Sequence, residues 1–182
     1  MMRNLEHVDF AHLVMDFDGV MTDDSVYITE LGAELVKCSR FDGAGIGLIK
    51  KANQLGLTNI EIIVVSSETN IVALSRSEKL GLDCEINVKN KFEFLCKRAI
   101  TELKITPDEF FSKTIYLGND LNDARSMQAS RLSIAPDNSH CRIKELADIV
   151  LPERGGHGFV RAAVEIILGT SVLETLMKEL YG

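Results

Sequence analysis

The fold is decided by the stretch His12-Leu-Val-Met-Asp-Phe-Asp-Gly19, in which a short apolar run ends in two carboxylates and a glycine. Such a run, bounded by polar turn residues, is typical of a strand buried on both faces of a parallel sheet. Gly19 leaves room for a sharp turn and a close backbone approach. The stretch predicts the first strand of an α/β sheet, with Asp16 and Asp18 at its carboxyl end.

Further apolar runs alternate with helical patterns along the rest of the chain. Strands are predicted over 60–65, 114–117 and, from a weaker signal, 149–151. Helices are predicted over 43–55, 69–80, 90–103, 121–129 and 157–168, and Thr106-Pro-Asp-Glu109 has the spacing of an additional helix start. This alternation predicts an α/β fold with a doubly wound parallel sheet.

One segment interrupts the alternation. Residues 25–29 and 34–38 have the pattern of two strands joined around Leu31-Gly32, which predicts a projecting β-hairpin over about 25–38. The hairpin is either a surface flap or a strand pair that joins partner subunits, because isolated hairpins are marginally stable. Near the chain end, helical spacing predicts a segment that docks on its own core or on a neighbour. Its apolar residues are Val172, Leu173, Leu176, Met177 and Leu180.

Composition narrows the class of protein. A chain of 182 residues with 46% hydrophobic content and no linker predicts a single domain over 1–182. The net charge of -7 argues against nucleic acid or an anionic membrane as a partner. Residues 1–10 lack an apolar signal core and no run is long enough to span a bilayer, so we expect a cytoplasmic protein. The four cysteines and four histidines show no metal-ligand spacing.

The ligand crevice of an open α/β sheet lies beyond the carboxyl ends of its strands. Ser66 and Ser67 follow the second predicted strand, Lys91 opens the helix over 90–103, and a run of glycine, amide and acid residues at 118–123 follows the third. Each alone has an ordinary explanation as a turn carboxylate, a helix cap or a surface lysine. Together they predict one polar site.

Two carboxylate clusters on neighbouring strands would repel each other unless a hard cation lay between them. Oxygen-rich sites suit Mg²⁺, so charge balance predicts magnesium. Such an ion neutralises a phosphoryl group while an aspartate attacks phosphorus, which divides hydrolysis into two steps.

These segments resemble the four motifs of haloacid dehalogenase-superfamily phosphatases: Asp-x-Asp-Gly-Val-x-Thr-Asp at 16–23, Ser66, Lys91 and Gly-Asn-Asp-x-x-Asp at 118–123. The resemblance implies that Asp16 is the nucleophile and Asp18 the acid/base. It implies that Ser66 and Lys91 contact the phosphoryl group. It also implies that Asp16, the Asp18 backbone carbonyl and Asp120 hold magnesium, supported by Asn122 and Asp123.

Over residues 9–168 the likeness extends to a capless branch that contains the 3-deoxy-octulosonate 8-phosphate phosphatases. The hairpin and the segments 41–45 and 154–161 carry it. The branch acts on eight- and nine-carbon keto-sugar acid phosphates. The resemblance implies a homotetramer joined by hairpins, no cap domain, and a C-terminal tail over about 153–182 that approaches the site. Asp42 and Asn122 are expected among the substrate contacts.

The sequence departs from the octulosonate pattern after the second strand, where Ser66-Ser67-Glu68 replaces a hydroxyl followed by Gly-Arg. Glu68 with Arg76 and Lys79 resembles the nonulosonate 9-phosphate phosphatases and the related domain of some sialic-acid cytidylyltransferases. This resemblance favours a nine-carbon substrate, whose carboxylate would pair with Arg76 or Lys79. Octulosonate 8-phosphate is the alternative.

Three other classes of function agree less well with the sequence. A non-catalytic oligomerisation or regulatory module of sialic-acid metabolism is disfavoured because the full set of acids and Lys91 is present. A phospho-receiver domain places its acids in a different order along the chain. Mutases of the superfamily usually carry a cap, and the sequence has no insertion of that size.

Overall fold

A computed structural model of the chain describes residues 9–181. Its centre is a six-stranded sheet in the order β5-β4-β1-β6-β7-β8, in which all neighbouring strands run parallel. The strands are β1 His12–Met15, β4 Glu61–Val65, β5 Asp83–Glu85, β6 Thr114–Leu117, β7 Leu132–Pro136 and β8 Ile149–Leu151. The predicted α/β class is confirmed. Strand order reverses at β1, so the ligand crevice is expected where β1, β4 and β6 end.

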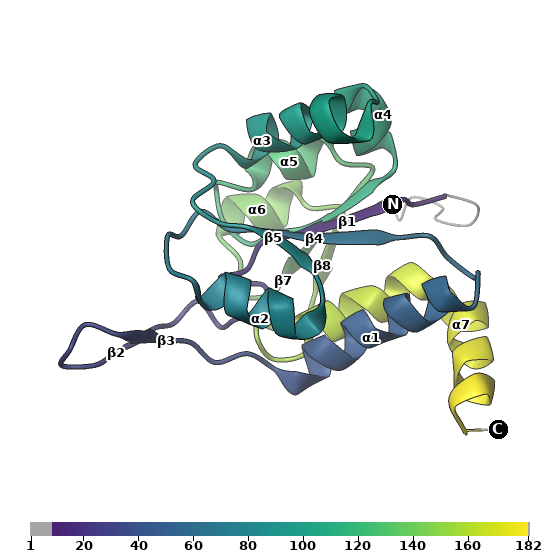
Figure 1. The fold of residues 1–182 in the computed structure, drawn as a ribbon, viewed down its shortest axis with the longest axis horizontal. Helices are drawn as coiled ribbons and strands as arrows, with labels where there is room; N and C mark the ends of the chain where they lie inside the picture. Colours follow the sequence, from purple (N-terminus) through teal and green to yellow (C-terminus); the bar gives the residue numbers. More distant parts are fainter. Residues whose placement is uncertain (1–8, 182) are drawn as a thin grey trace.

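Helices cover both faces of the sheet (Figure 1). One face carries α1 Arg40–Gln54, α2 Val72–Leu80 and α7 Phe159–Tyr181. The other carries α3 Lys91–Arg98, α4 Pro107–Ser112, α5 Ala124–Ala129 and α6 Cys141–Leu146. Within β1, Leu13 and Met15 pack into the core beneath the first layer and Val14 into the core beneath the second. This alternation follows from the two-residue period of a strand, and it fixes β1 between two apolar layers.

Two strands and one helix were not predicted. β5 has acids at both ends and lies at the sheet edge, so it lacks an apolar run. β7 is buried throughout but contains Ser133, whose hydroxyl donates to the Asp148 carboxylate at 3.0 Å. A serine satisfied by a distant acid removes the hydrophobic signal without weakening the strand. The predicted four-strand pattern was therefore incomplete, and α6, a six-residue helix, was missed with it.

The helix boundaries agree closely with prediction where capping signals exist. Thr106 caps α4 by accepting the Glu109 N–H at 3.2 Å, and Pro107 occupies the first turn. The helix predicted over 90–103 begins at Lys91 after an Asn90 cap and ends in a π-helical turn, Ala99–Leu103. A cap residue fixes where a helix begins because it satisfies backbone N–H groups that have no helical partner.

The predicted hairpin is present and projects from the body of the molecule (Figure 1). Its paired strands, β2 Tyr27–Ile28 and β3 Glu34–Leu35, are antiparallel and shorter than expected. Its apolar side chains are exposed, with Leu31 at the tip 96% accessible. Only the base of the hairpin reaches the core, where Val36 and Cys38 pack against it, so the paired strands themselves gain little stability from burial.

The end of the chain continues the last predicted helix. α7 bends at Gly169, whose φ of 68° is outside the helical region. Beyond the bend, Leu176 is buried in the core and Val172 and Leu173 pack against it, so this segment docks on its own domain. None of the described helices has the length and apolarity to cross a membrane. Residues 1–8, which make up most of the stretch predicted to lack a signal core, lie outside the described residues.

Candidate active site

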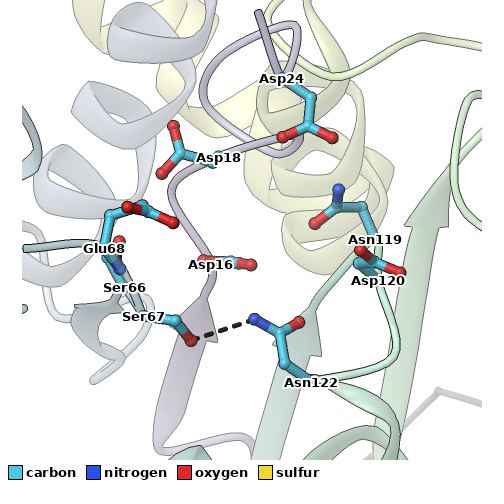
Figure 2. Close-up of a pocket in the computed structure, with 9 residues that line it drawn as sticks. All are labelled: Asp16, Asp18, Asp24, Ser66, Ser67, Glu68, Asn119, Asp120 and Asn122. Atoms are coloured by element: carbon cyan, nitrogen blue, oxygen red, sulfur yellow. Dashed lines mark hydrogen bonds between the residues drawn. The ribbon is translucent and has the colours of Figure 1, made fainter. Parts of the chain in front are cut away.

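A pocket of about 140 Å³ lies where β1, β4 and β6 end (Figure 2). Nine residues line it: Asp16, Asp18, Asp24, Ser66, Ser67, Glu68, Asn119, Asp120 and Asn122. Five of the nine are acids, and none is a cation. The structure thus brings together the predicted residues Asp16, Asp18, Ser66, Glu68, Asp120 and Asn122.

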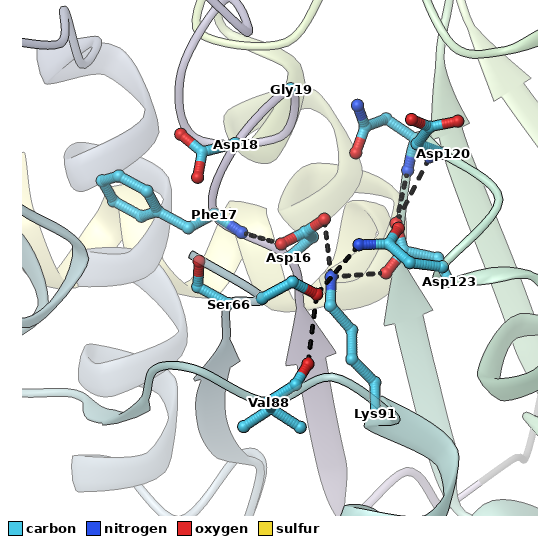
Figure 3. A network of polar contacts seen from close by, with 12 residues as sticks. Asp16, Phe17, Asp18, Gly19, Ser66, Val88, Lys91, Asp120 and Asp123 are labelled. Atoms are coloured by element: carbon cyan, nitrogen blue, oxygen red, sulfur yellow. Dashed lines mark hydrogen bonds and ion pairs between the residues drawn. The ribbon is translucent and has the colours of Figure 1, made fainter. Parts of the chain in front are cut away.

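Lys91 supplies the positive charge beneath the pocket (Figure 3). Its Nζ lies 2.6 Å from Asp16 Oδ2 and 2.8 Å from Asp123 Oδ1, and its side chain is fully buried. Asp123 also accepts hydrogen bonds from the Tyr116 hydroxyl at 2.8 Å and the Asn119 N–H at 3.0 Å. Asp123 is therefore held on all sides, whereas Asp16 faces the pocket.

The charges in this cluster do not balance. Burial, together with the nearby Asp123 carboxylate, raises the pKa of Asp16 well above its usual range, and Lys91 opposes that shift. Burial alone would lower the pKa of Lys91, but the Asp16 and Asp123 carboxylates outweigh it and raise the pKa. Two acids share one ammonium, so a further cation in the pocket would stabilise the ionised form of Asp16.

Asp18 occupies a different environment from Asp16. It is half-buried, and burial together with the Asp24 and Glu68 carboxylates raises its pKa. A carboxyl group with a raised pKa keeps its proton at higher pH, which suits a proton donor. The two acids of the first strand are therefore differentiated, one ion-paired with Lys91 and the other surrounded by like charge.

The end of β4 contributes two hydroxyls. Ser66 is buried and its Oγ accepts the Glu68 N–H at 3.2 Å, which leaves the hydroxyl hydrogen able to donate. Ser67 donates to the Val88 carbonyl at 3.1 Å. It accepts from Asn122 Nδ2 at 3.0 Å (Figure 2). Ser67 and Asn122 thus join opposite walls of the pocket.

Asn119 is a pocket residue that sequence reasoning missed. Its side chain is nearly buried, and Oδ1 has no hydrogen-bond partner among the described residues. A Cβ on Gly19 would lie 1.8 Å from Asn119 Nδ2, so only glycine admits this side chain. The sequence signal for Asn119 is its position directly after Gly118, at the end of β6 and next to Asp120. Asp24, also missed, reaches the pocket through a left-handed backbone, φ 65°, that no sequence signal indicated.

The donor set fits a hard divalent cation. Asp16, Asp18, Asn119 and Asp120 all present oxygen, the element that Mg²⁺ prefers. No ready-made group of three His, Cys, Asp or Glu ligands exists within residues 9–181. A site here therefore also needs amide or backbone oxygens, and the unpartnered Asn119 Oδ1 is of the kind that Mg²⁺ takes as a ligand.

Three predicted substrate contacts lie outside the pocket. Asp42 is only 1% exposed and accepts the Arg161 N–H at 3.1 Å, so it anchors the first turn of α7. This contact gives Asp42 a structural role, and its expected contact with substrate stays a prediction. Arg76 donates to the Ser39 carbonyl at 3.2 Å, and Lys79 is exposed on α2. A substrate role for these two cations stays a prediction.

Comparison with known proteins places this site in a family. No protein-family model matches the chain. It is 26% identical over 168 residues to 3-deoxy-D-manno-octulosonate 8-phosphate phosphatase KdsC of Haemophilus influenzae, covering 92% of this chain and 87% of that protein. The same phosphatase of Moraxella catarrhalis, solved with magnesium ion, phosphate ion and KDO, shares the fold. Its TM-score is 0.83 at 20% identity, over 95% of this chain and 94% of that one.

A solved HAD family hydrolase from Streptomyces avermitilis is more similar in sequence. It is 31% identical, with a TM-score of 0.78, and the match covers 90% of this chain and 88% of that chain. Sequence and fold therefore agree over nearly the whole length of both proteins. The chain belongs to the HAD, or haloacid dehalogenase, family of hydrolases.

Proposed function

We propose that this protein is a magnesium-dependent phosphatase that hydrolyses a phosphomonoester through an aspartyl-phosphate intermediate. The observation that carries the proposal is the buried Asp16–Lys91–Asp123 cluster beneath a pocket of acids. A carboxylate held against an ammonium at the base of a pocket is positioned as a nucleophile.

The first step forms a bond between an Asp16 carboxylate oxygen and phosphorus as the bond from phosphorus to the ester oxygen breaks. Asp18 gives its proton to that ester oxygen, so the leaving group departs as a neutral alcohol. Ser66 and Lys91 hold the phosphoryl oxygens in place. In the second step Asp18 takes a proton from water, whose oxygen bonds to phosphorus and releases Asp16 and inorganic phosphate.

The residues that would hold magnesium are Asp16, the backbone carbonyl of Asp18, Asp120 and the unpartnered Asn119 Oδ1. When bound, the ion neutralises charge on the transferring phosphoryl group. Support comes from the oxygen-rich lining of the pocket and from the magnesium bound by the Moraxella catarrhalis phosphatase.

The substrate we propose is a phosphorylated keto-sugar acid. Glu68 lines the pocket, where its carboxylate would accept hydrogen bonds from substrate hydroxyls. Its presence in place of an arginine favours a nine-carbon, nonulosonate 9-phosphate substrate. Octulosonate 8-phosphate is the second candidate, favoured by the names of the curated relatives.

A homotetramer joined by hairpins is part of the same proposal. Its support is the exposed apolar surface of the hairpin, in which Tyr27 is 67% and Ile28 68% accessible. None of the nine described residues that line the pocket is a cation. A second subunit would bring charged groups, such as Lys79 of α2, toward the carboxylate of the sugar acid.

A phosphate-release screen tests the proposal. The substrates are a nonulosonate 9-phosphate, octulosonate 8-phosphate and a hexose phosphate, each with and without magnesium. We expect magnesium-dependent release, greatest with the nine-carbon compound, and none from Asp16→Asn. If the wild-type protein is as inert as Asp16→Asn on all three, the non-catalytic module becomes the better interpretation.

A further inference from the structure

Thr22 is a buried hydroxyl that the proposed steps do not use. It lies in the loop after β1 and is completely inaccessible to solvent. Its Oγ1 accepts the Gly19 N–H and the Asp24 N–H, each at 3.2 Å. It donates to Asp18 Oδ1 at 3.4 Å. Thr22 therefore touches the residue proposed as the acid/base, but not the pocket itself.

The hydrogen-bond arithmetic of a hydroxyl makes this arrangement directional. A threonine hydroxyl has two acceptor lone pairs and one hydrogen. Two backbone N–H groups take the lone pairs, so the hydrogen is left for Asp18. Because Thr22 has no lone pair to offer, a proton on Asp18 Oδ1 would find no acceptor there. The catalytic proton of Asp18 belongs on Oδ2.

The surroundings hold Thr22 in this position. The backbone of Thr22 forms a β-bridge with Cys38. The turn at Gly155 and Gly156 packs directly on it, since a Cβ on Gly156 would lie 2.5 Å from the Thr22 carbonyl carbon. The Gly156 N–H also donates to the Val20 carbonyl at 3.1 Å. The backbone of Thr22 is thus fixed by these contacts, and its hydroxyl is fixed by its three hydrogen bonds.

We propose that Thr22 is a positioning residue that holds Asp18 as a proton donor. The inference rests on the proposed phosphatase function and deepens it. Because Oδ1 accepts the Thr22 hydrogen, the proton of protonated Asp18 lies on Oδ2, the oxygen free to face the ester oxygen. That proton moves to the ester oxygen as the phosphorus–oxygen bond breaks and the Asp16–phosphorus bond forms. The donor distance of 3.4 Å is long, as catalytic hydrogen bonds often are before substrate binds.

The test uses the dependence of rate on the leaving group. An alkyl phosphate needs a proton on its departing oxygen, whereas p-nitrophenolate leaves readily as an anion. Thr22→Val keeps the shape of the side chain and removes the hydroxyl, and Thr22→Ser keeps the hydroxyl. We expect Thr22→Val to lower kcat/KM for the sugar-acid phosphate by roughly 10- to 100-fold, and that for p-nitrophenyl phosphate by no more than about threefold.

Controls separate positioning from folding. Thr22→Ser should recover most of the lost activity. Thr58→Val removes another threonine hydrogen bond, the 2.7 Å donation to Asn53 Oδ1 on the far side of the domain, and should leave both substrates unaffected. In an Asp18→Asn background, Thr22→Val should change neither rate further, because Asp18 transmits its effect. If the Thr22→Val variant does not fold, the Thr22→Ala variant is used in its place in these assays.

Two results would overturn the inference while leaving the phosphatase function intact. One is an equal loss for both substrates in Thr22→Val, and the other is a loss that serine does not restore. A wild-type protein that releases phosphate from neither substrate would instead remove the proposed function, and this inference with it.

Discussion

Asp24 shows how one residue adjusts the chemistry of another across the pocket. Its carboxylate is one of the two like charges that, after burial, raise the pKa of Asp18. Its left-handed backbone, φ 65°, turns the side chain into the pocket. Aspartate and asparagine tolerate this conformation better than most residues.

Asp24→Asn is therefore predicted to move the basic limb of the kcat/KM–pH profile to lower pH. Leaving-group protonation needs protonated Asp18, so activity falls as pH rises through the pKa of Asp18. Removing a like charge lowers that pKa, and the fall begins earlier. The profile is measured at saturating magnesium with an alkyl phosphate. Asp23→Asn removes the adjacent charge, which is paired with Lys37 at 3.3 Å, and should leave the limb in place. A shift to higher pH would contradict the assignment.

Asn119 allows a test of the metal site that does not depend on turnover. We predict that Asn119→Asp increases the thermal stabilisation produced by magnesium, because a carboxylate replaces the unpartnered amide oxygen. Without magnesium the variant should be less stable than wild type by about 1–3 kcal/mol, since the site gains an unpaired buried charge. Melting temperatures across a magnesium series measure both effects.

The control for this prediction is Asn59→Asp, which adds the same charge at an exposed position before β4. It should change neither the stability nor the response to magnesium. If Asn119→Asp behaves like Asn59→Asp, Asn119 does not face the ion.

The sequence predicted which acids form this site, but the contacts that set their separate chemical roles could not be predicted from it. Asp16, Asp18 and Asp120 were found because each follows an apolar strand. Thr22 and Asn119 stand inside the motifs at 16–23 and 118–123, but their roles depend on contacts that form only in the folded chain. Asp24 was missed because its left-handed backbone has no sequence signal. The contact between Asp42 and the first turn of α7 spans 119 residues of sequence, so no local pattern could predict it.

At the scale of elements, strands with continuous apolar runs were predictable and the others were not. β1, β4 and β6 are central and buried, so their sequences are apolar. β5 is held by pairing with β4 at one edge of the sheet. β7 is buried and pairs with β6 and β8, but Ser133 interrupts its apolar run and its hydroxyl is satisfied by Asp148. In both strands the continuous apolar run on which sequence reasoning depends is absent.

Helix α1 offers a matched pair of glycines for testing how closely it packs on α7. A Cβ on Gly45 would lie 2.8 Å from Arg161 Cα, whereas one on Gly47 would meet nothing within 4 Å. We predict that Gly45→Ala destabilises the protein by about 1–3 kcal/mol, because the two helices must separate. Gly47→Ala should stabilise it by about 0.5–1 kcal/mol through helix propensity. Urea denaturation measures both, and equal effects would exclude close packing as the reason for Gly45.

Viewed as a whole, the molecule supports its site from both ends of the chain. The loop after β1 carries Asp16 and Asp18, and the turn at Gly155–Gly156 packs against that loop from the far end of the sequence. The hairpin comes directly after this loop in the sequence, and it projects from the body of the protein (Figure 1). The most exposed apolar surface is thus attached to the loop that carries the chemistry.

This arrangement predicts that the hairpin holds subunits together. Tyr27 and Leu35 are cross-strand partners, 67% and 57% accessible. Replacing them by Tyr27→Lys and Leu35→Glu removes the apolar face, while the opposite charges still favour the strand pair. Wild type should sediment at about fourfold the 20.2 kDa mass of one chain, and the double variant at the mass of one chain. Met177→Lys, which changes a 62% exposed side chain on α7, should not alter the assembly. An apolar surface that joins subunits cannot tolerate two charges at its centre, so a double variant that still assembles would contradict this role of the hairpin. A wild-type monomer would contradict it as well.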